Sequence, residues 1–353
     1  MRRCISGIVA LSAALALFAR TPAVAQNRVR VVTTLPTYAA LAREITGDLA
    51  DVEAIARGDV DPHFVNPRPS FAAMMRSADL FVTTGLDLEL WVPTLLDRAN
   101  NSRILDGAPG QVVAYAGVRL LDIPESVSRT GGDVHVFGNP HIHTSPINAI
   151  TIARNITAGL KRVDAQHGST YDANLADLES RLLRRLFGTE LVDALGEETL
   201  FRLAATGEFW SFVEAQSLGG RPLTDYLGGW LAQAAPFRNR RIVCYHKNWA
   251  YFSDLFRIEC AMYVEPKPGI PPSPGHVGDV MSFIRDQNIQ ALLAANHFSR
   301  SQVERVASRT GVQAVIVPLH EGGEEGINDY FALVDAWVNR LVTAFQAAPS
   351  EID

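Results

Sequence analysis

The sequence predicts an α/β protein with two lobes, each a mostly parallel sheet flanked by helices, joined by a long connecting helix. Short β-type runs alternate with helical segments in both halves of the 353-residue chain. Strands that alternate with helices in this way are typical of β/α units on a parallel sheet. The chain suits about two domains of roughly 100 to 200 residues each. Its 47% hydrophobic content is enough for two cores.

The first lobe is expected over residues 26–145. A run of valines and threonines predicts its first strand, and glycines follow the first helix and the third strand as end signals. Strands are expected at 29–34, 52–55 and 80–84, and helices at 38–45 and 70–77.

The connecting helix is expected over 146–187. Ile152, Ile156 and Leu160 share one helical face, and a similar apolar stripe continues beyond Gly168, which is a candidate break in the helix. The second lobe is expected over 188–353. It begins with an irregular region up to residue 240, to which the sequence assigns no function, and then returns to alternating strands and helices. Its strands are expected near 241–245, 258–264, 291–294 and 314–317.

The charge balance excludes one class of partner. The chain has 32 Lys and Arg residues and 38 Asp and Glu residues, which gives a formal net charge of -6. No block of basic residues is present that could neutralise a row of phosphates. We therefore expect no nucleic-acid partner.

The first 25 residues have the features of a secretory signal peptide. Arg2 and Arg3 precede an apolar stretch over 5–19, and Ala23-Val24-Ala25 offers the small residues at which such signals are cleaved. The apolar stretch of about 15 residues is shorter than the roughly 20 that span a bilayer, which favours cleavage after Ala25 over a membrane anchor. The mature protein is thus expected outside the cytoplasm, in the periplasm.

Export would place Cys244 and Cys260 in an oxidising compartment. The two residues lie in neighbouring predicted strands, so a disulfide bridge is compatible with the fold. Two buried free thiols are the alternative, because the sequence does not give the geometry that a bridge needs.

The placement of the histidines indicates a metal site. His63, His246 and His320 come just after predicted strands, and His141 lies in the loop that ends the first lobe. The carboxyl ends of the strands border the ligand crevice of an open α/β sheet. Imidazoles bind Zn²⁺ in tetrahedral sites, whereas oxygen-rich sites favour Mn²⁺ or Mg²⁺. A histidine-dominated set therefore favours zinc.

At these residues the chain resembles the periplasmic metal-binding proteins of ABC importers for zinc and manganese, the cluster A-I group. The resemblance extends over almost the whole mature chain and is specific in the order and spacing of its fragments. These include Val32-Thr33-Thr34-Leu35-Pro36, Asp61-Pro62-His63, Asn139-Pro140-His141 and His246-Lys247-Asn248-Trp249-Ala250-Tyr251-Phe252.

The resemblance implies that side chains from both lobes hold one divalent metal. His63, His141 and His246 match three family ligands, while the fourth is usually an aspartate in an Asp-Pro-Leu run. Here that run reads Val317-Pro318-Leu319, so we expect His320 as the fourth ligand, with Glu321 or water as alternatives. The resemblance also implies a monomer that delivers Zn²⁺, with Mn²⁺ less favoured, to an ABC permease in the membrane.

The other histidines are given supporting or structural roles. His143 is a candidate second contact or alternative ligand, and His135, in a glycine-bounded loop, is a candidate first contact for incoming metal. His276 is expected at the start of a helix, and His167 and His297 at the surface. Asp59 and Asp61 are candidates to orient a ligand through its second ring nitrogen.

The sequence gives little support for catalysis. It has no Gly-x-Ser-x-Gly elbow, no His-Glu-x-x-His pair and no phosphate-binding loop. We therefore expect a protein that is not an enzyme. Two alternatives remain open: a secreted zinc hydrolase with Glu321 as general base, and a periplasmic metal buffer or chaperone. Because imidazoles bind metal when neutral, affinity is expected to fall below about pH 6.5.

Overall fold

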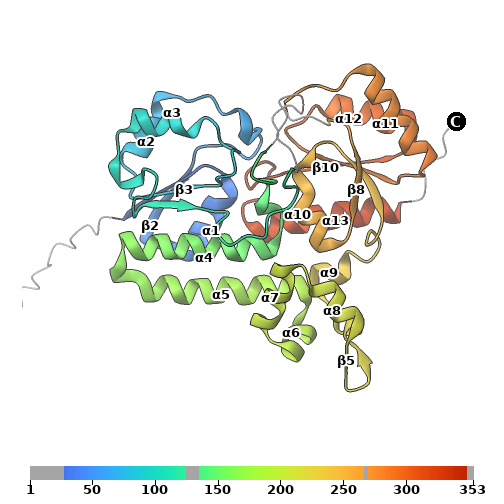
Figure 1. The fold of residues 1–353 in the computed structure, drawn as a ribbon, viewed down its shortest axis with the longest axis horizontal. Helices are drawn as coiled ribbons and strands as arrows, with labels where there is room; N and C mark the ends of the chain where they lie inside the picture. The colour runs from blue at the N-terminus through green and yellow to red at the C-terminus, as the bar shows by residue number, and fades with distance from the viewer. Residues whose placement is uncertain (1–27, 125–134, 266–268, 348–353) are drawn as a thin grey trace, which may run out of the picture.

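The computed structural model describes residues 28–124, 135–265 and 269–347. It has two lobes, each built on a four-stranded sheet (Figure 1). The expected signal peptide and its cleavage after Ala25 lie outside the described residues. No described helix is both long enough and apolar enough to span a membrane.

The first sheet has the strand order β2-β1-β3-β4, and all its neighbours pair in parallel. The three predicted strands are confirmed with small shifts at their ends. The fourth has only three residues, too few for a recognisable pattern, and was not predicted. The strands are β1 (Val29–Thr33), β2 (Ala50–Ala54), β3 (Leu80–Thr83) and β4 (Gln111–Val113).

Helices cover both faces of this sheet. Successive strand residues point to opposite faces, so Val31 packs with the α1 (Pro36–Thr46) side and Val32 with the α2 (Pro69–Arg76) and α3 (Val92–Ala99) side. This burial on both sides explains why the central strands β1 and β3 are largely apolar. Helix α1 begins at a proline, which is well suited to the first helical position.

The connecting segment is two helices, α4 (Pro146–Val163) and α5 (Gly168–Phe187), and the expected single long helix is corrected in this respect. The break lies at 164–167, next to the candidate glycine. The ion pairs Arg154–Glu179 and Lys161–Asp172 join the helices, and their numbering shows that α4 and α5 run antiparallel (Figure 1). Asp164 accepts hydrogen bonds from His167 and Tyr171, which fixes the turn.

Helix α5 contacts both lobes. Its Arg181 pairs with Glu44 of α1, and one turn later Arg185 pairs with Asp335 of the last helix. The same helix therefore contacts the first lobe and then the second.

The second sheet repeats the parallel arrangement with the order β10-β9-β7-β8. All its predicted strands are confirmed. The elements are β7 (Arg241–Cys244), β8 (Glu259–Tyr263), β9 (Ala291–Ala295) and β10 (Gln313–Val317), with helices α10 (Ala250–Phe256), α11 (Pro274–Asp286), α12 (Arg300–Thr310) and α13 (Tyr330–Gln346).

Strands β7 and β8 are joined by a disulfide between Cys244 and Cys260, whose Cα atoms are 5.4 Å apart. Of the two states that the sequence left open, the structure therefore has the bridge. The bridge lies two residues before His246 and ties that end of β7 to its neighbour.

The region 188–240 packs beneath the second lobe (Figure 1). It holds short helices and a two-stranded hairpin instead of further sheet strands. These are α6 (Thr189–Leu195), α7 (Glu197–Thr206), α8 (Phe209–Ala215), β5 (Ser217–Leu218), β6 (Arg221–Pro222) and α9 (Gly229–Gln233).

Candidate metal centre

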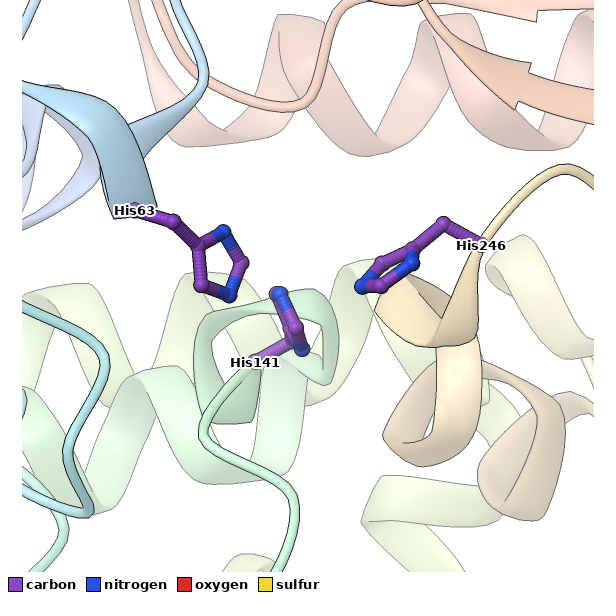
Figure 2. Close-up of side chains that lie close together, drawn as sticks. All are labelled: His63, His141 and His246. Atoms are coloured by element: carbon purple, nitrogen blue, oxygen red, sulfur yellow. The ribbon is translucent and has the colours of Figure 1, made fainter. Parts of the chain in front are cut away.

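Three histidines from three separate segments converge between the lobes. His63 lies in a 3-10 turn (Pro62–Phe64) after β2, His141 lies just before another (Ile142–Thr144), and His246 follows β7. Figure 2 shows their rings turned toward one another. One ligand atom from each ring lies within 4.8 Å of the other two. We call His63, His141 and His246 the three-histidine group.

Two of these rings are held in the same way, by hydrogen bonds to the side chain two residues earlier in the sequence. Asp61 accepts a hydrogen bond from Nδ1 of His63 at 2.7 Å, and also one from its backbone N–H at 3.0 Å. Asn139 does the same for His141, at 2.9 Å and 3.0 Å. In each case Nδ1 carries the proton, so Nε2 presents its lone pair. Such a partner on the second ring nitrogen is the usual companion of a metal-binding histidine.

His246 is held by packing more than by hydrogen bonding. Its Nδ1 lies 3.9 Å from a carboxylate oxygen of Glu265, beyond hydrogen-bond range, and its ring packs against Phe298 with centroids 5.8 Å apart. The side chain is 3% exposed.

Burial keeps the imidazoles of His141 and His246 neutral. Desolvation, followed by the charge of His63, lowers the pKa of His246 to about 3 and that of His141 well below its usual value. A buried imidazolium loses its hydration without gaining a compensating anion, so the uncharged form is favoured. The uncharged form is also the one that binds a metal.

His135 joins the edge of the group. Its Nε2 lies 3.2 Å from Nε2 of His63. Two nitrogens bound at about 2.0–2.1 Å to one tetrahedral ion are roughly 3.3 Å apart, so this spacing fits a shared ion. Burial, followed by the charge of His63, lowers the pKa of His135 to about 4. His135 therefore lies beside the centre, although, like His320, it is not among the residues whose ligand atoms all lie within 4.8 Å of one another.

The structure does not bring His320, the expected fourth ligand, into the three-histidine group. Thr37 of α1 holds the His320 Nδ1 at 3.0 Å and donates a 2.7 Å hydrogen bond to Glu321. The His320 ring stacks on His143 with centroids 4.5 Å apart. Contacts with α1 therefore direct both candidates, His320 and Glu321, to a position beside the group. Burial raises the pKa of Glu321 to about 7.

His297 was missed as a neighbour of the site. Both of its ring nitrogens are buried without a hydrogen-bond partner among the described residues, so its expected surface position is wrong. Burial lowers its pKa to about 4, against an opposing effect of Asp61. The sequence could have indicated this position, because His297 follows strand β9 as His246 follows β7. His276 lies in the first turn of α11, as predicted.

A family model matches most of the chain. It is described as ZnuA, zinc-uptake complex component A, periplasmic, and it matches residues 31–185 and 226–344. The chain belongs to this family. ZnuA-family proteins are periplasmic solute-binding proteins that bind a divalent metal and work with an ABC permease. The resemblance read from the motifs is thereby confirmed. Residues 186–225, which include the hairpin, fall outside the match.

Individual relatives agree with the ZnuA family. The iron-binding protein YfeA of Yersinia pestis is 25% identical over 337 residues, covering 94% of this chain and 90% of YfeA. The high-affinity zinc uptake system protein ZnuA of Bacillus subtilis is 27% identical over 187 residues, covering 51% of this chain and 57% of that protein. A crystal structure of ZnuA matches the fold with a TM-score of 0.66 and 19% identity, covering 91% of this chain and all of that one.

Proposed function

We propose that this chain captures Zn²⁺ at the three-histidine group and delivers it to an ABC permease. The observation that carries the proposal is the convergence of His63, His141 and His246 within 4.8 Å. Their segments come from both lobes, so a bound ion would join the lobes through its ligands. His135 supplies the fourth nitrogen in this proposal, in place of His320.

The donor set favours zinc over the other metals of this class. The three-histidine group contains imidazoles alone, and its carboxylate neighbour Asp61 accepts a hydrogen bond from a ring instead of facing the centre. Zn²⁺ takes tetrahedral nitrogen sites readily, whereas Mn²⁺ prefers oxygen ligands. Relatives of this chain include proteins named for iron and for zinc, so the metal has to be tested directly.

Metal competition tests the proposal. The metal-free mature protein is dialysed against equimolar Zn²⁺, Mn²⁺ and Fe²⁺ under anaerobic conditions, and bound metals are counted by mass spectrometry. We expect zinc to dominate and His141→Ala to abolish high-affinity retention. His276→Ala, a histidine of α11 outside the centre, is the matched control. Retention of manganese or iron in preference to zinc would overturn the metal assignment, and equal retention by both variants would overturn the site.

Delivery to the permease is tested separately from zinc binding. Four nitrogen ligands would close the coordination shell, which favours retention, whereas a catalytic zinc keeps an open position for water. Glu321, the base of a hydrolase alternative, is held by Thr37 beside the centre. We expect zinc-limited cells that lack this chain to regain zinc uptake with the wild type but not with His141→Ala. Rescue that does not need the permease would favour a buffer. We further propose a monomer, to be checked by analytical ultracentrifugation.

A further inference from the structure

His246 is the member of the three-histidine group whose Nδ1 has no hydrogen-bond partner among the described residues. The rings of His63 and His141 are anchored at Nδ1 by Asp61 and Asn139. Figure 2 shows the His246 nitrogen farther from the backbone turned toward the other two rings, which leaves Nδ1 on the outer side. A metal-bound imidazole almost always donates its other ring N–H to a carboxylate, a carbonyl or water. His246 therefore lacks a partner of the kind that the other two rings have.

Glu265, two residues after β8, holds a carboxylate beside this nitrogen. Its Oε1 lies 3.9 Å from Nδ1 of His246 and accepts a 2.8 Å hydrogen bond from the backbone N–H of Gly269. Gly269 in turn packs against Phe64, the residue after His63, since a Cβ at Gly269 would lie 2.8 Å from Cζ of Phe64. The carboxylate is thus held at the seam between the lobes, about 1 Å short of a hydrogen bond to His246.

The surroundings of Glu265 favour a cation nearby. Its side chain is 11% exposed, and no Lys or Arg within residues 28–124, 135–265 and 269–347 forms an ion pair with it. Burial raises the pKa of Glu265, the hydrogen bond from Gly269 opposes this, and the charge of Asp61 raises the pKa further. Buried charges in proteins are normally paired or bound to metal. A divalent cation at the three-histidine group would supply the positive charge that this carboxylate lacks.

We propose that Glu265 is the positioning residue of His246. When Zn²⁺ binds Nε2 of His246, Nδ1 keeps its proton, and Glu265 moves about 1 Å closer to accept a hydrogen bond from it. This hydrogen bond orients the ring and makes its metal-binding nitrogen more basic. The charges of Glu265 and Asp61 together balance the charge of the ion. The inference rests on the proposed capture of zinc at the three-histidine group, and Glu265 itself binds no metal in it.

Two substitutions separate the charge of Glu265 from its hydrogen bond. Glu265→Gln keeps an acceptor but loses the charge, whereas Glu265→Ala loses both. Chelator competition should show zinc affinity lowered by about 10- to 100-fold in Glu265→Gln and by more in Glu265→Ala. Glu259→Gln is the matched control with wild-type affinity, because Glu259 is an exposed carboxylate of β8.

Thermal unfolding distinguishes positioning from a role in folding. Metal-free Glu265→Gln should unfold at the wild-type temperature or above it, because the substitution removes a buried charge without a cation partner. The rise in unfolding temperature on adding Zn²⁺ should be smaller than in the wild type, because the metal binds more weakly. A residue needed only for folding would instead lower the unfolding temperature of the metal-free protein.

Cobalt-substituted protein reports on the His246 ring directly. Ring N–H protons of imidazoles bound to paramagnetic Co²⁺ give shifted NMR signals, which disappear when the protons exchange rapidly with water. We expect one such signal to disappear in Glu265→Ala and to move in Glu265→Gln, while Asp61→Asn affects a different signal. The visible Co²⁺ spectrum of Glu265→Gln should keep its wild-type shape, because the ligands are unchanged.

Three results overturn the role of Glu265 while leaving the proposed function intact. In the first, Glu265→Gln and Glu265→Ala bind zinc as tightly as the wild type, with unchanged N–H signals. In the second, the visible Co²⁺ spectrum changes in Glu265→Gln, which would make Glu265 a ligand. In the third, metal-free Glu265→Gln unfolds at a lower temperature than the wild type. Zinc retention by His141→Ala equal to that of the wild type would instead overturn the proposed function, and this inference with it.

Discussion

Asp61 and His63 form a hydrogen-bonded side-chain pair in the three-histidine group, of which His63 is a member. The carboxylate oxygen lies 2.7 Å from Nδ1 of the ring and also accepts the His63 backbone N–H. Burial opposes ionisation of Asp61, but the hydrogen bonds and charge of His63 outweigh it and lower its pKa to about 2. The carboxylate therefore stays charged at neutral pH and raises the basicity of the ring nitrogen that faces the metal.

Asp61→Asn should weaken zinc binding without removing it. The amide keeps the shape of the side chain but loses the charge, and loss of such a partner typically costs about 10- to 100-fold in metal affinity. Asp59→Asn is the matched control, because Asp59 pairs with Arg57 at the surface two residues away. Competition titrations with a zinc chelator give the affinities. Equal affinities for both variants would show that Asp61 does not act through His63.

His135→Gln tests the proposed fourth ligand. The variant should still bind zinc, but more weakly by at least about tenfold, since one of four metal–nitrogen bonds is lost. Cobalt substitution provides a second readout, because the visible spectrum of bound Co²⁺ reports the number and type of ligands. An unchanged Co²⁺ spectrum in the variant would exclude His135 from the coordination shell.

The pH dependence of zinc affinity should be shallow in mild acid. The pKa of His246 is lowered to about 3, and that of His141 also lies well below its usual value, because both are buried. Three ordinary histidines, with pKa values of about 6.5, would together lose roughly a thousandfold in affinity per pH unit well below that value. Since burial shifts proton competition at these two rings to lower pH, we expect the loss between pH 6 and pH 5 to be far smaller than a thousandfold.

Chelator titrations at each pH check this slope. The fall below about pH 6.5 that the sequence predicts assumes ordinary histidines, and burial moves the titration of His141 and His246 to lower pH. A steep loss starting near pH 6.5 would mean that both rings are exposed to solvent in the metal-free protein.

Local patterns were sufficient to predict the fold and much of the centre. A histidine after a strand of a parallel sheet lies at the ligand-binding edge whatever the details of packing. His63 and His246 converge for that reason, whereas His141 lies just before the turn that leads into α4. The spacing of apolar residues likewise predicted both sheets and the helical segment between them.

Long-range contacts account for what the sequence did not predict. His320 follows β10 as His246 follows β7, but only the folded chain shows that Thr37 of α1 holds it beside His143. Such contacts have no local pattern, because they are chosen by packing between distant segments.

Loss of the Cys244–Cys260 bridge should affect both stability and metal binding. Closing a loop of about 15 residues contributes roughly 3 kcal/mol by restricting the unfolded chain. We expect Cys244→Ala/Cys260→Ala to reduce the free energy of unfolding by about that amount, measured by urea denaturation of the metal-free protein. Zinc affinity should fall as well, because the bridge holds the end of β7 two residues before His246. An unchanged affinity would show that packing alone positions His246.

The loops that carry Gly58 and Gly323 bring the two lobes into direct backbone contact. A Cβ at Gly58 would lie 2.2 Å from the carbonyl oxygen of Glu321 and 2.4 Å from the backbone nitrogen of Gly323. Backbone atoms cannot move aside as a flexible side chain can. Gly58→Ala should therefore force the loops apart and lower the free energy of unfolding by about 1–3 kcal/mol.

Gly278→Ala is the matched control, because a Cβ there meets no atom within 4 Å and Gly278 lies inside α11. Alanine favours a helix over glycine by up to about 1 kcal/mol, so this variant should be neutral or more stable. Thermal unfolding compares the two proteins. Zinc affinity should fall in Gly58→Ala alone, because His63 and His246 belong to different lobes and their separation depends on this contact. A Gly58→Ala protein with wild-type affinity would show that the three-histidine group tolerates a wider gap between the lobes.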